Sequence, residues 1–194
     1  MKNEWDDYAE GWDIDLTVKV YAKNAFSELT ANIDINDLAV LDFGCGTGSL
    51  TKLMSPYAKS VLAIDSSSEM IKHLNSKRLS NVCSIADYLS EGLIKSTPEL
   101  SHQFDLIVAS SVCSFLDDYD ETLKLLSSLL KDGGRFVQWD WYAESESSEM
   151  GLTEQRVANA LLETGFDVIK ITKPFVMTSS KGNMPVLMAI AKKA

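Results

Sequence analysis

The chain has 194 residues and a formal net charge of −10, and 45% of its residues are hydrophobic. A chain of this length can bury a core without disulfides or a structural metal, so we expect one domain over residues 1–194. The acidic balance argues against nucleic acid and anionic membranes as partners, because both are bound through clustered lysine and arginine. Three cysteines, two histidines and no apolar run of about 20 residues predict no metal site and no membrane span. The expected compartment is the cytoplasm.

The first 13 residues are acidic, yet aromatic side chains interrupt them, which predicts that they pack on the body of the protein. These aromatic residues are Trp5, Tyr8 and Trp12. From about Ile14 to Leu29, apolar residues recur at helical spacing, among them Leu16 and Val20. We therefore expect residues 1–32 to form a lead-in and an amphipathic helix that lies over one edge of a sheet and covers a cleft.

Residues 40–48 read Val-Leu-Asp-Phe-Gly-Cys-Gly-Thr-Gly and combine a strand with a glycine loop. Glycine permits positive φ and has no Cβ that would hold a ligand away from the main chain. A helical pattern follows through Met54 and stops before Pro56. Strand, glycine loop and helix, in this order, open a nucleotide-binding β-α-β unit.

The glycine spacing is G-x-G-x-G, and Ser49 stands where a dinucleotide-binding loop has its third glycine. Asp42 lies just before the first glycine. This combination resembles motif I of the class I S-adenosylmethionine-dependent methyltransferases, in which the loop wraps the methionine end of the cofactor and no phosphate is bound. The alternative for the nonapeptide alone is an ordinary glycine-rich turn in an α/β protein.

Acidic residues also end the next two predicted strands. Asp65 follows the strand Val61–Ile64, at about the 20-residue offset of a ribose-binding acid. A carboxylate can accept a hydrogen bond from both ribose hydroxyls. The alternative is an acid stabilised by the N-terminus of a helix, since Ser66 and Glu69 have capping-box spacing.

Asp87 follows the third strand, residues 82–86, and the resemblance implies that it accepts from the exocyclic amine of adenine. Ligands of open α/β sheets bind at the carboxyl ends of the strands, so three acids there predict one site. The resemblance covers nearly the whole chain and is most specific over residues 40–140. It implies S-adenosylmethionine as the cofactor and the following binding residues: Asp42, Gly44, Cys45, Gly46, Thr47, Gly48, Asp65, Ser66, Met70, Ala86, Asp87 and Ser110.

Residues 88–103 are expected to form a loop, and Phe104–Ala109 a buried fourth strand. After that strand, enzymes that methylate the amines of nucleic-acid bases carry an Asn/Asp-Pro-Pro-aromatic motif. This chain has Ala-Ser-Ser-Val at residues 109–112 instead, which disfavours nucleic-acid substrates further.

A helix capped by Asp120 is expected from about Glu121 to Leu130, followed by a turn over residues 131–134. A fifth strand starts at Arg135 and leads into residues 139–142, Trp-Asp-Trp-Tyr. These residues are either a substrate wall or a hydrophobic seam that covers the sheet edge. The candidate substrate contacts are Tyr8, Trp12, Asp140, Trp141 and Tyr142.

Near the end of the chain, Thr153 is expected to cap a helix that ends at Gly165. Strand-like runs at residues 166–172 and 186–191 are joined by a short connection at 179–183, so they form an antiparallel hairpin. The predicted fold is α/β, the Rossmann-like class I methyltransferase fold, with a mostly parallel seven-stranded sheet and a C-terminal antiparallel hairpin.

We therefore expect a methyltransferase that transfers a methyl group from S-adenosylmethionine to a small-molecule acceptor. One alternative is a protein that binds this cofactor and regulates another enzyme without catalysis. A nicotinamide dehydrogenase is disfavoured by Ser49 and by the hairpin. No residue identifies itself as the catalytic base, and His73 and His102 are expected at the surface. The acceptor, its methylated atom and the oligomeric state stay open.

Overall fold

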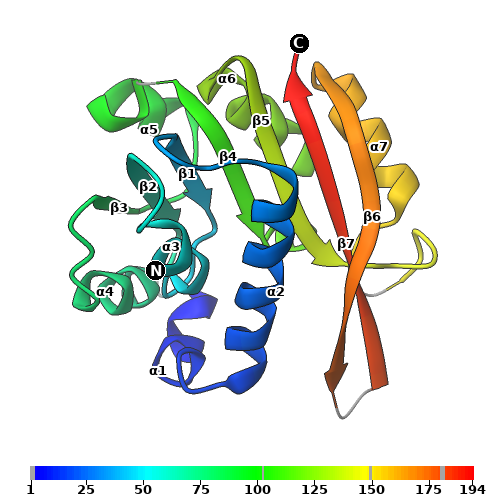
Figure 1. Cartoon of the computed structure of the whole chain (residues 1–194), viewed down its shortest axis with the longest axis horizontal. Coiled ribbons are helices and arrows are strands. Elements are labelled where there is room, and N and C mark those ends of the chain that lie inside the picture. Colours follow the sequence, from blue (N-terminus) through cyan, green and yellow to red (C-terminus); the bar gives the residue numbers. More distant parts are fainter. Residues whose placement is uncertain (1–2, 102, 149, 180–181) are drawn as a thin grey trace.

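A seven-stranded sheet in the order β3-β2-β1-β4-β5-β7-β6 forms the frame of the protein (Figure 1). The computed structural model describes residues 3–101, 103–148, 150–179 and 182–194. The first five strands run parallel, and β7 is antiparallel to both β5 and β6. The strands are β1 (Ala39–Phe43), β2 (Ser60–Asp65), β3 (Val82–Ala86), β4 (Phe104–Ser110), β5 (Leu130–Trp141), β6 (Phe166–Ser179) and β7 (Gly182–Lys193). The predicted fold is confirmed.

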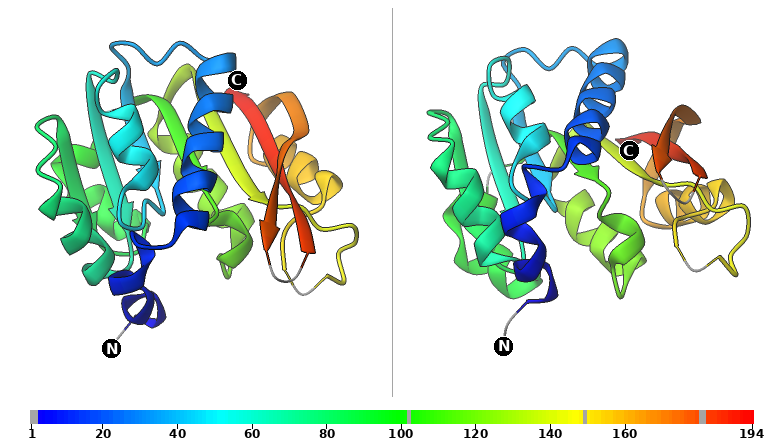
Figure 2. Two further views of the ribbon diagram at one scale, coloured as in Figure 1. Left: turned by 60° about the horizontal axis from the view of Figure 1, so that its bottom comes forward. Right: turned by 90° about the horizontal axis from the view of Figure 1, so that it is seen from below.

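Helices cover both faces of this sheet (Figure 2). One buried cluster joins α2 and α3 to the sheet, and a second joins α6 and α7 to the opposite face. Successive residues of a strand point to opposite faces, so Val40 enters the first cluster and Leu41 the second. The helices are η1 (Glu4–Tyr8), α1 (Ala9–Trp12), α2 (Leu16–Asn32), α3 (Ser49–Met54), α4 (Ser68–Ser76), α5 (Glu91–Ser96), η2 (Pro98–Ser101), η3 (Cys113–Phe115), α6 (Tyr119–Leu129) and α7 (Glu154–Glu163).

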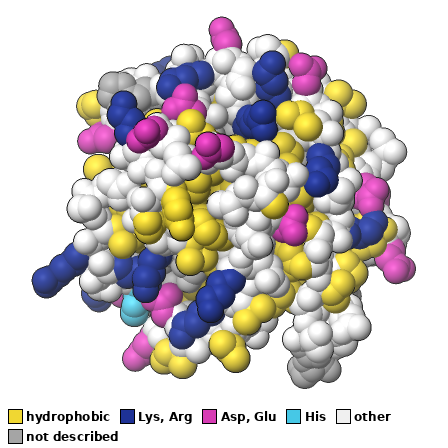
Figure 3. Space-filling model, in the orientation of Figure 1, with side chains coloured by type: hydrophobic (Ala, Val, Ile, Leu, Met, Phe, Trp, Pro, Cys, Tyr) yellow, Lys and Arg dark blue, Asp and Glu magenta, His cyan; other side chains and the backbone are white. Residues whose placement is uncertain are grey.

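Helix α2 lies on a face of the sheet and packs against its central strands, not over an edge as predicted. Its buried stripe is Tyr21, Ala25 and Leu29, whereas Leu16 is 71% exposed and Val20 is 39% exposed. Ala25 is fully buried in this stripe, where its small side chain allows α2 to lie close to the sheet. Hydrophobic side chains are exposed on the face that carries α2 and α3 (Figure 3).

The prediction of a loop over residues 88–103 is wrong. Ser90 accepts a hydrogen bond from the Leu93 main-chain N–H (3.1 Å) and so caps α5, and η2 begins at Pro98. Leu93 and Ile94 pack against the buried cluster of that face. This helix has only two turns, so the periodic signal is too short to recognise.

Two predicted caps are displaced by one or two residues. Ser67, not Ser66, caps α4 by accepting from the Met70 N–H (3.1 Å). Asp118, not Asp120, caps α6, which leaves Asp120 free to form an ion pair with Arg156 (2.8 Å). At both sites the predicted cap and the observed cap are polar residues that can accept a main-chain N–H, so the sequence alone does not show which of the two caps the helix.

The last three strands are longer than predicted. Residues 131–134 belong to β5 instead of forming a separate turn, and the pairing with β4 shifts register between Phe104 and Leu106. Strand β6 contains two register shifts, which break the alternation of its side chains. His102 and residues 180–181 of the hairpin connection lie outside the described residues, and His73 is half-buried in α4. None of the described helices is long and apolar enough to cross a membrane.

Candidate functional site

The carboxyl ends of four neighbouring strands meet at one end of the sheet. Phe43 at the end of β1 pairs with Ile64 of β2 and with Ala109 of β4. Asp65 of β2 pairs with Ala86 of β3. The glycine loop, the acids of β2 and β3 and the residue that ends β4 are thus brought together, where open α/β sheets bind ligands. Helices η1 and α1 contact α4 at this end of the sheet (Figure 2).

The first and third glycines of the loop are required by the packing of the protein itself. All three glycines have positive φ, between 55° and 82°. A Cβ on Gly44 would lie 2.4 Å from Cγ2 of Val112, and one on Gly48 would lie 2.3 Å from Cδ1 of Leu74. The glycine pattern predicted that a ligand approaches the main chain at all three positions, but at Gly44 and Gly48 side chains of the protein fill the space.

The middle glycine is the one that faces the N-terminal segment. The atom nearest to a Cβ on Gly46 would be Nε1 of Trp12, at 3.5 Å. The next residue, Thr47, is buried and donates its hydroxyl to Asp13 (2.6 Å). The Cys45 thiol donates to the Gly46 carbonyl (3.5 Å), and burial raises its pKa well above the usual value. The candidate contact surface of this loop is therefore its middle, around Gly46.

Asp42 lies beneath the loop and is only 1% exposed. Its carboxylate accepts a hydrogen bond from the Thr51 hydroxyl (2.5 Å), which ties β1 to α3. Burial raises the pKa of Asp42 to about 7, and the nearby Asp65 adds to this shift against the bonds from Thr51. We therefore interpret the Asp42 side chain as a support for the loop, without direct contact to a ligand.

Asp65 is held by main-chain donors on both sides. One carboxylate oxygen accepts from the Gly46 N–H (2.8 Å) and the other from the Ser67 N–H (2.9 Å). Burial raises the pKa of Asp65, although these two bonds oppose the shift. Each oxygen keeps a further lone pair, so the braced carboxylate can still accept hydrogen bonds from a ligand.

The end of β3 is the open side of this region. Ala86 and Asp87 are both exposed, and the Asp87 N–H donates to the Asp65 carbonyl (3.0 Å). The Asp87 carboxylate accepts from the Tyr88 N–H (2.8 Å). Met70, in contrast, is 2% exposed and belongs to the core. Asp87 is thus accessible to a ligand, whereas the Met70 side chain is not.

The lead-in binds to both loops that surround Asp65. Asn3 donates to the Ser66 hydroxyl (2.9 Å), and Asp6 accepts from the Ser67 hydroxyl (2.6 Å). Asp13 accepts from Thr47 and pairs with Lys77. Burial opposes the charge on Asp13, but the bonds from Lys77 and Thr47 outweigh it and lower its pKa. The segment therefore covers the candidate cofactor loops through specific polar contacts.

An aromatic cluster continues this cover toward the end of β4. The Trp5 ring lies 5.8 Å from Tyr8, 6.3 Å from Trp12 and 5.2 Å from Phe115, measured between ring centroids. Trp5 connects the lead-in to η3, although sequence reasoning selected only its two neighbours. The signal available was its place among the three aromatic residues of an acidic segment. Tyr8 is 58% exposed at the rim of the cluster.

The chain matches the family model of a methyltransferase domain over residues 41–136, a stretch that contains the glycine loop, Asp65 and Asp87. The chain belongs to the S-adenosylmethionine-dependent methyltransferase family. The resemblance found in the sequence is confirmed. The solved DhpI–SAH complex shares the fold, with a TM-score of 0.75 and 19% identity over 98% of this chain and 93% of that chain.

Curated methyltransferases match over a shorter part of their own length. Malonyl-[acyl-carrier protein] O-methyltransferase of Priestia megaterium is 29% identical over 144 residues, which cover 71% of this chain and 49% of that protein. Ubiquinone biosynthesis O-methyltransferase of Xanthomonas oryzae pv. oryzae is 27% identical over 138 residues, which cover 70% of this chain and 55% of that protein. The chain thus spans about half the length of the curated relatives it matches.

The candidate substrate residues lie on different sides of the sheet. Asp140 is fully buried and accepts from the Ser114 N–H (3.0 Å) and the Gln138 amide (3.3 Å). Burial raises the pKa of Asp140 to about 7, and its bonds to Ser114 and Cys113 limit the shift. A buried acid of this kind can influence its neighbours but does not reach the surface.

Trp141 and Tyr142 are both half-buried, but they pack on opposite clusters because neighbouring strand residues alternate. The Trp141 ring lies 5.4 Å from Tyr21, whereas Tyr142 lies under Lys173, whose Nζ is 4.3 Å from the ring centroid. Trp141 is therefore the candidate that lies on the same face of the sheet as α2. Tyr8 and Trp12 belong to the cover and not to this wall.

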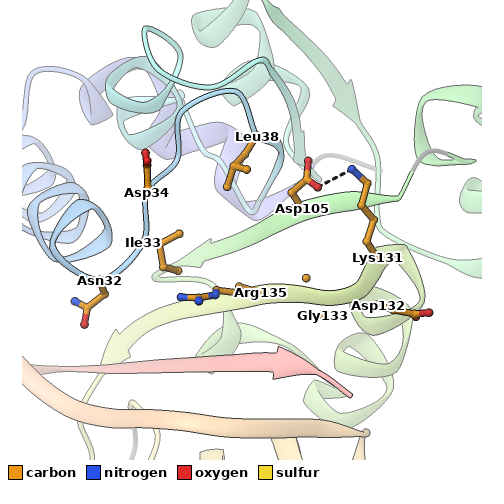
Figure 4. A pocket seen from close by; sticks show the side chains of 10 residues that line it. Asn32, Ile33, Asp34, Leu38, Asp105, Lys131, Asp132, Gly133 and Arg135 are labelled. Atoms are coloured by element: carbon orange, nitrogen blue, oxygen red, sulfur yellow. Dashed lines mark hydrogen bonds and ion pairs between the residues drawn. The ribbon is translucent and has the colours of Figure 1, made fainter.

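A separate hollow of about 430 Å³ lies at the other end of the sheet, where β1, β4 and β5 begin (Figure 4). Asp105 forms an ion pair there with Lys131 (2.6 Å) and also accepts from the Ala39 N–H (2.9 Å). The described residues hold no group of three or more His, Cys, Asp or Glu placed to bind a metal. The lining residues are Asn32, Ile33, Asp34, Leu38, Asp105, Lys131, Asp132, Gly133, Gly134 and Arg135.

Proposed function

We propose that this chain transfers the methyl group of S-adenosylmethionine to a small-molecule acceptor. The observation that carries the proposal is the bracing of Asp65 by two main-chain N–H groups, one of them from Gly46 of the glycine loop. A fixed carboxylate with free acceptor capacity suits the paired hydroxyls of a ribose. The same acid would contribute negative charge near the cationic sulfonium of the cofactor.

The remaining cofactor contacts follow from accessibility. The main chain around Gly46 would hold the methionine end of the cofactor with Ser110, Cys45 and Thr47. Asp87, with Ala86 beside it, would accept from the adenine amine. Gly44, Gly48, Asp42 and Met70 support this proposal as parts of the framework under the loop, and Ser66 as an anchor of the lead-in.

Catalysis in this proposal is mainly placement. The acceptor must lie in line with the S–CH₃ bond at near-attack distance, in a cleft from which water is excluded. The lead-in supports this, because its polar contacts and the Trp5 cluster extend from the cofactor loops to η3. The net charge of −10 and the similarity to a ubiquinone biosynthesis O-methyltransferase favour a small acceptor over nucleic acid.

Calorimetric titration with S-adenosylmethionine and with NAD tests the cofactor. We expect heat with the first ligand only, and binding of NAD alone would overturn the proposal. Incubation with methyl-labelled cofactor and a metabolite extract then tests catalysis, and we expect label in a small molecule.

The second candidate is a cofactor-binding regulatory protein without catalysis. The burial of Asp140 favours it, because this residue, the one acid among the predicted substrate contacts, does not reach the surface. Cofactor binding without label transfer to any fraction of the extract, protein included, would support this candidate.

A further inference from the structure

The hollow at the amino end of the sheet is an open space beside the end of α2 (Figure 4). Helix α2 ends at Asn32, which lies at the rim of the hollow. Gly133 and Gly134 of β5 line it without side chains, so this part of its wall is main chain. Its volume of about 430 Å³ lies in the range of small-molecule sites.

The guanidinium of Arg135 is available to a ligand of this hollow. Neighbouring strand residues point to opposite faces of a sheet, so Arg135 lies on the same face as Val137, which is the face of α2. Within the described residues, the Arg135 side chain has no ion pair and no hydrogen bond. Arg156, in contrast, binds the carboxylate of Asp120 through two hydrogen bonds (2.8 and 2.9 Å). Arg135 thus keeps free the same fork, which suits a planar carboxylate.

The three acids that line the hollow each have another partner. Asp105 forms the ion pair with a lysine that is described above. Asp34 accepts from the main-chain N–H (3.1 Å) and the amide (2.7 Å) of Asn36. Asp132 lies 4.0 Å from Lys193, and its side chain is 94% exposed. The free guanidinium can balance one negative charge, whereas these acids repel a second one. The hollow therefore favours a monoanion over a dianion.

Two aliphatic side chains give the same space an apolar wall. Ile33 is 6% exposed, and Leu38 is half-buried. Figure 4 shows Ile33, Leu38 and Arg135 around one opening. An anion held by the guanidinium can therefore remove apolar surface from water when its body lies against these side chains.

We propose that this hollow binds a small organic monocarboxylate. Its carboxylate accepts two hydrogen bonds from the guanidinium of Arg135, and its apolar body lies against Ile33 and Leu38. The residues that line this site include none of those predicted to bind the cofactor. The inference goes beyond methyl transfer and does not depend on it.

Benzoate is the anionic probe, and benzamide is a neutral probe of similar shape. Both are titrated by NMR into wild type and Arg135→Gln. The Arg135 side chain is exposed and unpaired in the described chain, so we expect the same midpoint of thermal unfolding for both proteins. Benzoate should bind wild type about tenfold or more tightly than the variant, as the loss of a charge-assisted hydrogen bond predicts. Benzamide should not distinguish the two proteins.

Arg78→Gln is the matched control. The side chain of Arg78 also has no printed partner in the described chain, and it lines a different, smaller hollow of about 190 Å³. This variant loses the same charge and should bind benzoate as tightly as wild type. Arg135→Lys keeps the charge without the planar fork, so it should recover only part of the affinity that Arg135→Gln loses.

Chemical shifts locate the bound probe at one end of the sheet or the other. We expect benzoate to move the main-chain amide signals of Gly133 and Gly134. Phenyl phosphate, a dianion, should bind more weakly than benzoate. Four results would overturn the proposal: no saturable binding of benzoate, equal benzoate affinity of wild type and Arg135→Gln, tighter binding of phenyl phosphate, or shifts confined to the glycine loop.

Discussion

Two aspartates at opposite ends of the parallel strands both accept main-chain hydrogen bonds, but they differ in their other partners and in their pKa values. Asp65, at the carboxyl end of β2, accepts hydrogen bonds from two main-chain N–H groups, and burial raises its pKa. Asp105, at the amino end of β4, accepts the Ala39 N–H but also pairs with Lys131. Burial opposes its charge too, yet the lysine outweighs burial and lowers the pKa of Asp105.

Open volume is therefore a poor guide to the functional end of this sheet. The hollow of about 430 Å³ lies beside Asp105, where the acid is already neutralised (Figure 4). The carboxyl end is covered by the lead-in, but it gathers the acids whose pKa values are raised. Groups kept in an unfavourable charge environment are candidates for function, whereas a satisfied ion pair at a rim is usually structural.

The largest loss of stability is expected at the glycine loop, where the main chain lies close to neighbouring side chains. Gly44→Ala should lower the free energy of unfolding by about 2–4 kcal/mol, since it adds a clash with Val112 to the strain of a left-handed residue. Gly165→Ala is the matched control, because Gly165 has a φ of 85° and nothing within 4 Å of an added Cβ. Urea unfolding measures both, and equal losses would show that Val112 yields without cost.

The pH dependence of stability separates the buried acid of the loop from the paired acid at the other end. The pKa of Asp42 is about 7 in the folded protein and near 3.8 without burial, so its contribution to stability falls as pH rises from about 4 to 7. Asp42→Asn should remove this loss and be more stable than wild type at pH 8 by roughly 2–4 kcal/mol. The advantage should disappear near pH 4.

Asp105→Asn should show the opposite behaviour. The lowered pKa of Asp105 stabilises the fold above its unfolded pKa, and this contribution is lost as pH falls through the folded value. The variant should be less stable than wild type at pH 7, with a difference that shrinks in acid. Denaturant unfolding at several pH values checks both acids, and parallel curves for the two variants would contradict the contrast.

Asp65→Ala tests the cofactor site directly. We expect the affinity for S-adenosylmethionine to fall by about 1.5–3 kcal/mol, the range for a lost hydrogen bond to a charged group. Calorimetry measures the change, with Asp105→Ala as the control at the other end. An unchanged dissociation constant in Asp65→Ala would remove Asp65 from the site.

The smallest change in stability is expected at the hollow beside Asp105. Lys131→Ala breaks an ion pair whose side chains are 48% and 29% exposed, so it should cost less than about 1 kcal/mol of stability. Cofactor affinity and label transfer should not change. A marked loss of either in this variant would mean that the amino end takes part in function, and the comparison would fail.

The sequence alone determined features that depend on a few neighbouring residues. The third strand runs from Val82 to Ala86 as predicted, and Thr153 caps α7. The glycine loop led to the family, and the short connection of the last two strands led to the hairpin. Strand propensity, caps and turn residues act over about ten residues, so these features can be recognised without the rest of the chain.

Tertiary structure alone decided which side chains meet. The stripe through Leu16 and Val20 stays exposed because α2 packs on the sheet through its other side, which carries Tyr21, Ala25 and Leu29. Trp5 reaches Phe115, and the Tyr21 hydroxyl lies near Asp140, although each pair is separated by more than a hundred residues. Such contacts depend on how the helices dock on the sheet, which local patterns do not encode. For this reason the sequence identified the glycine loop and the acids that follow β2 and β3, whereas the contacts of the lead-in with both loops became visible only in the folded protein.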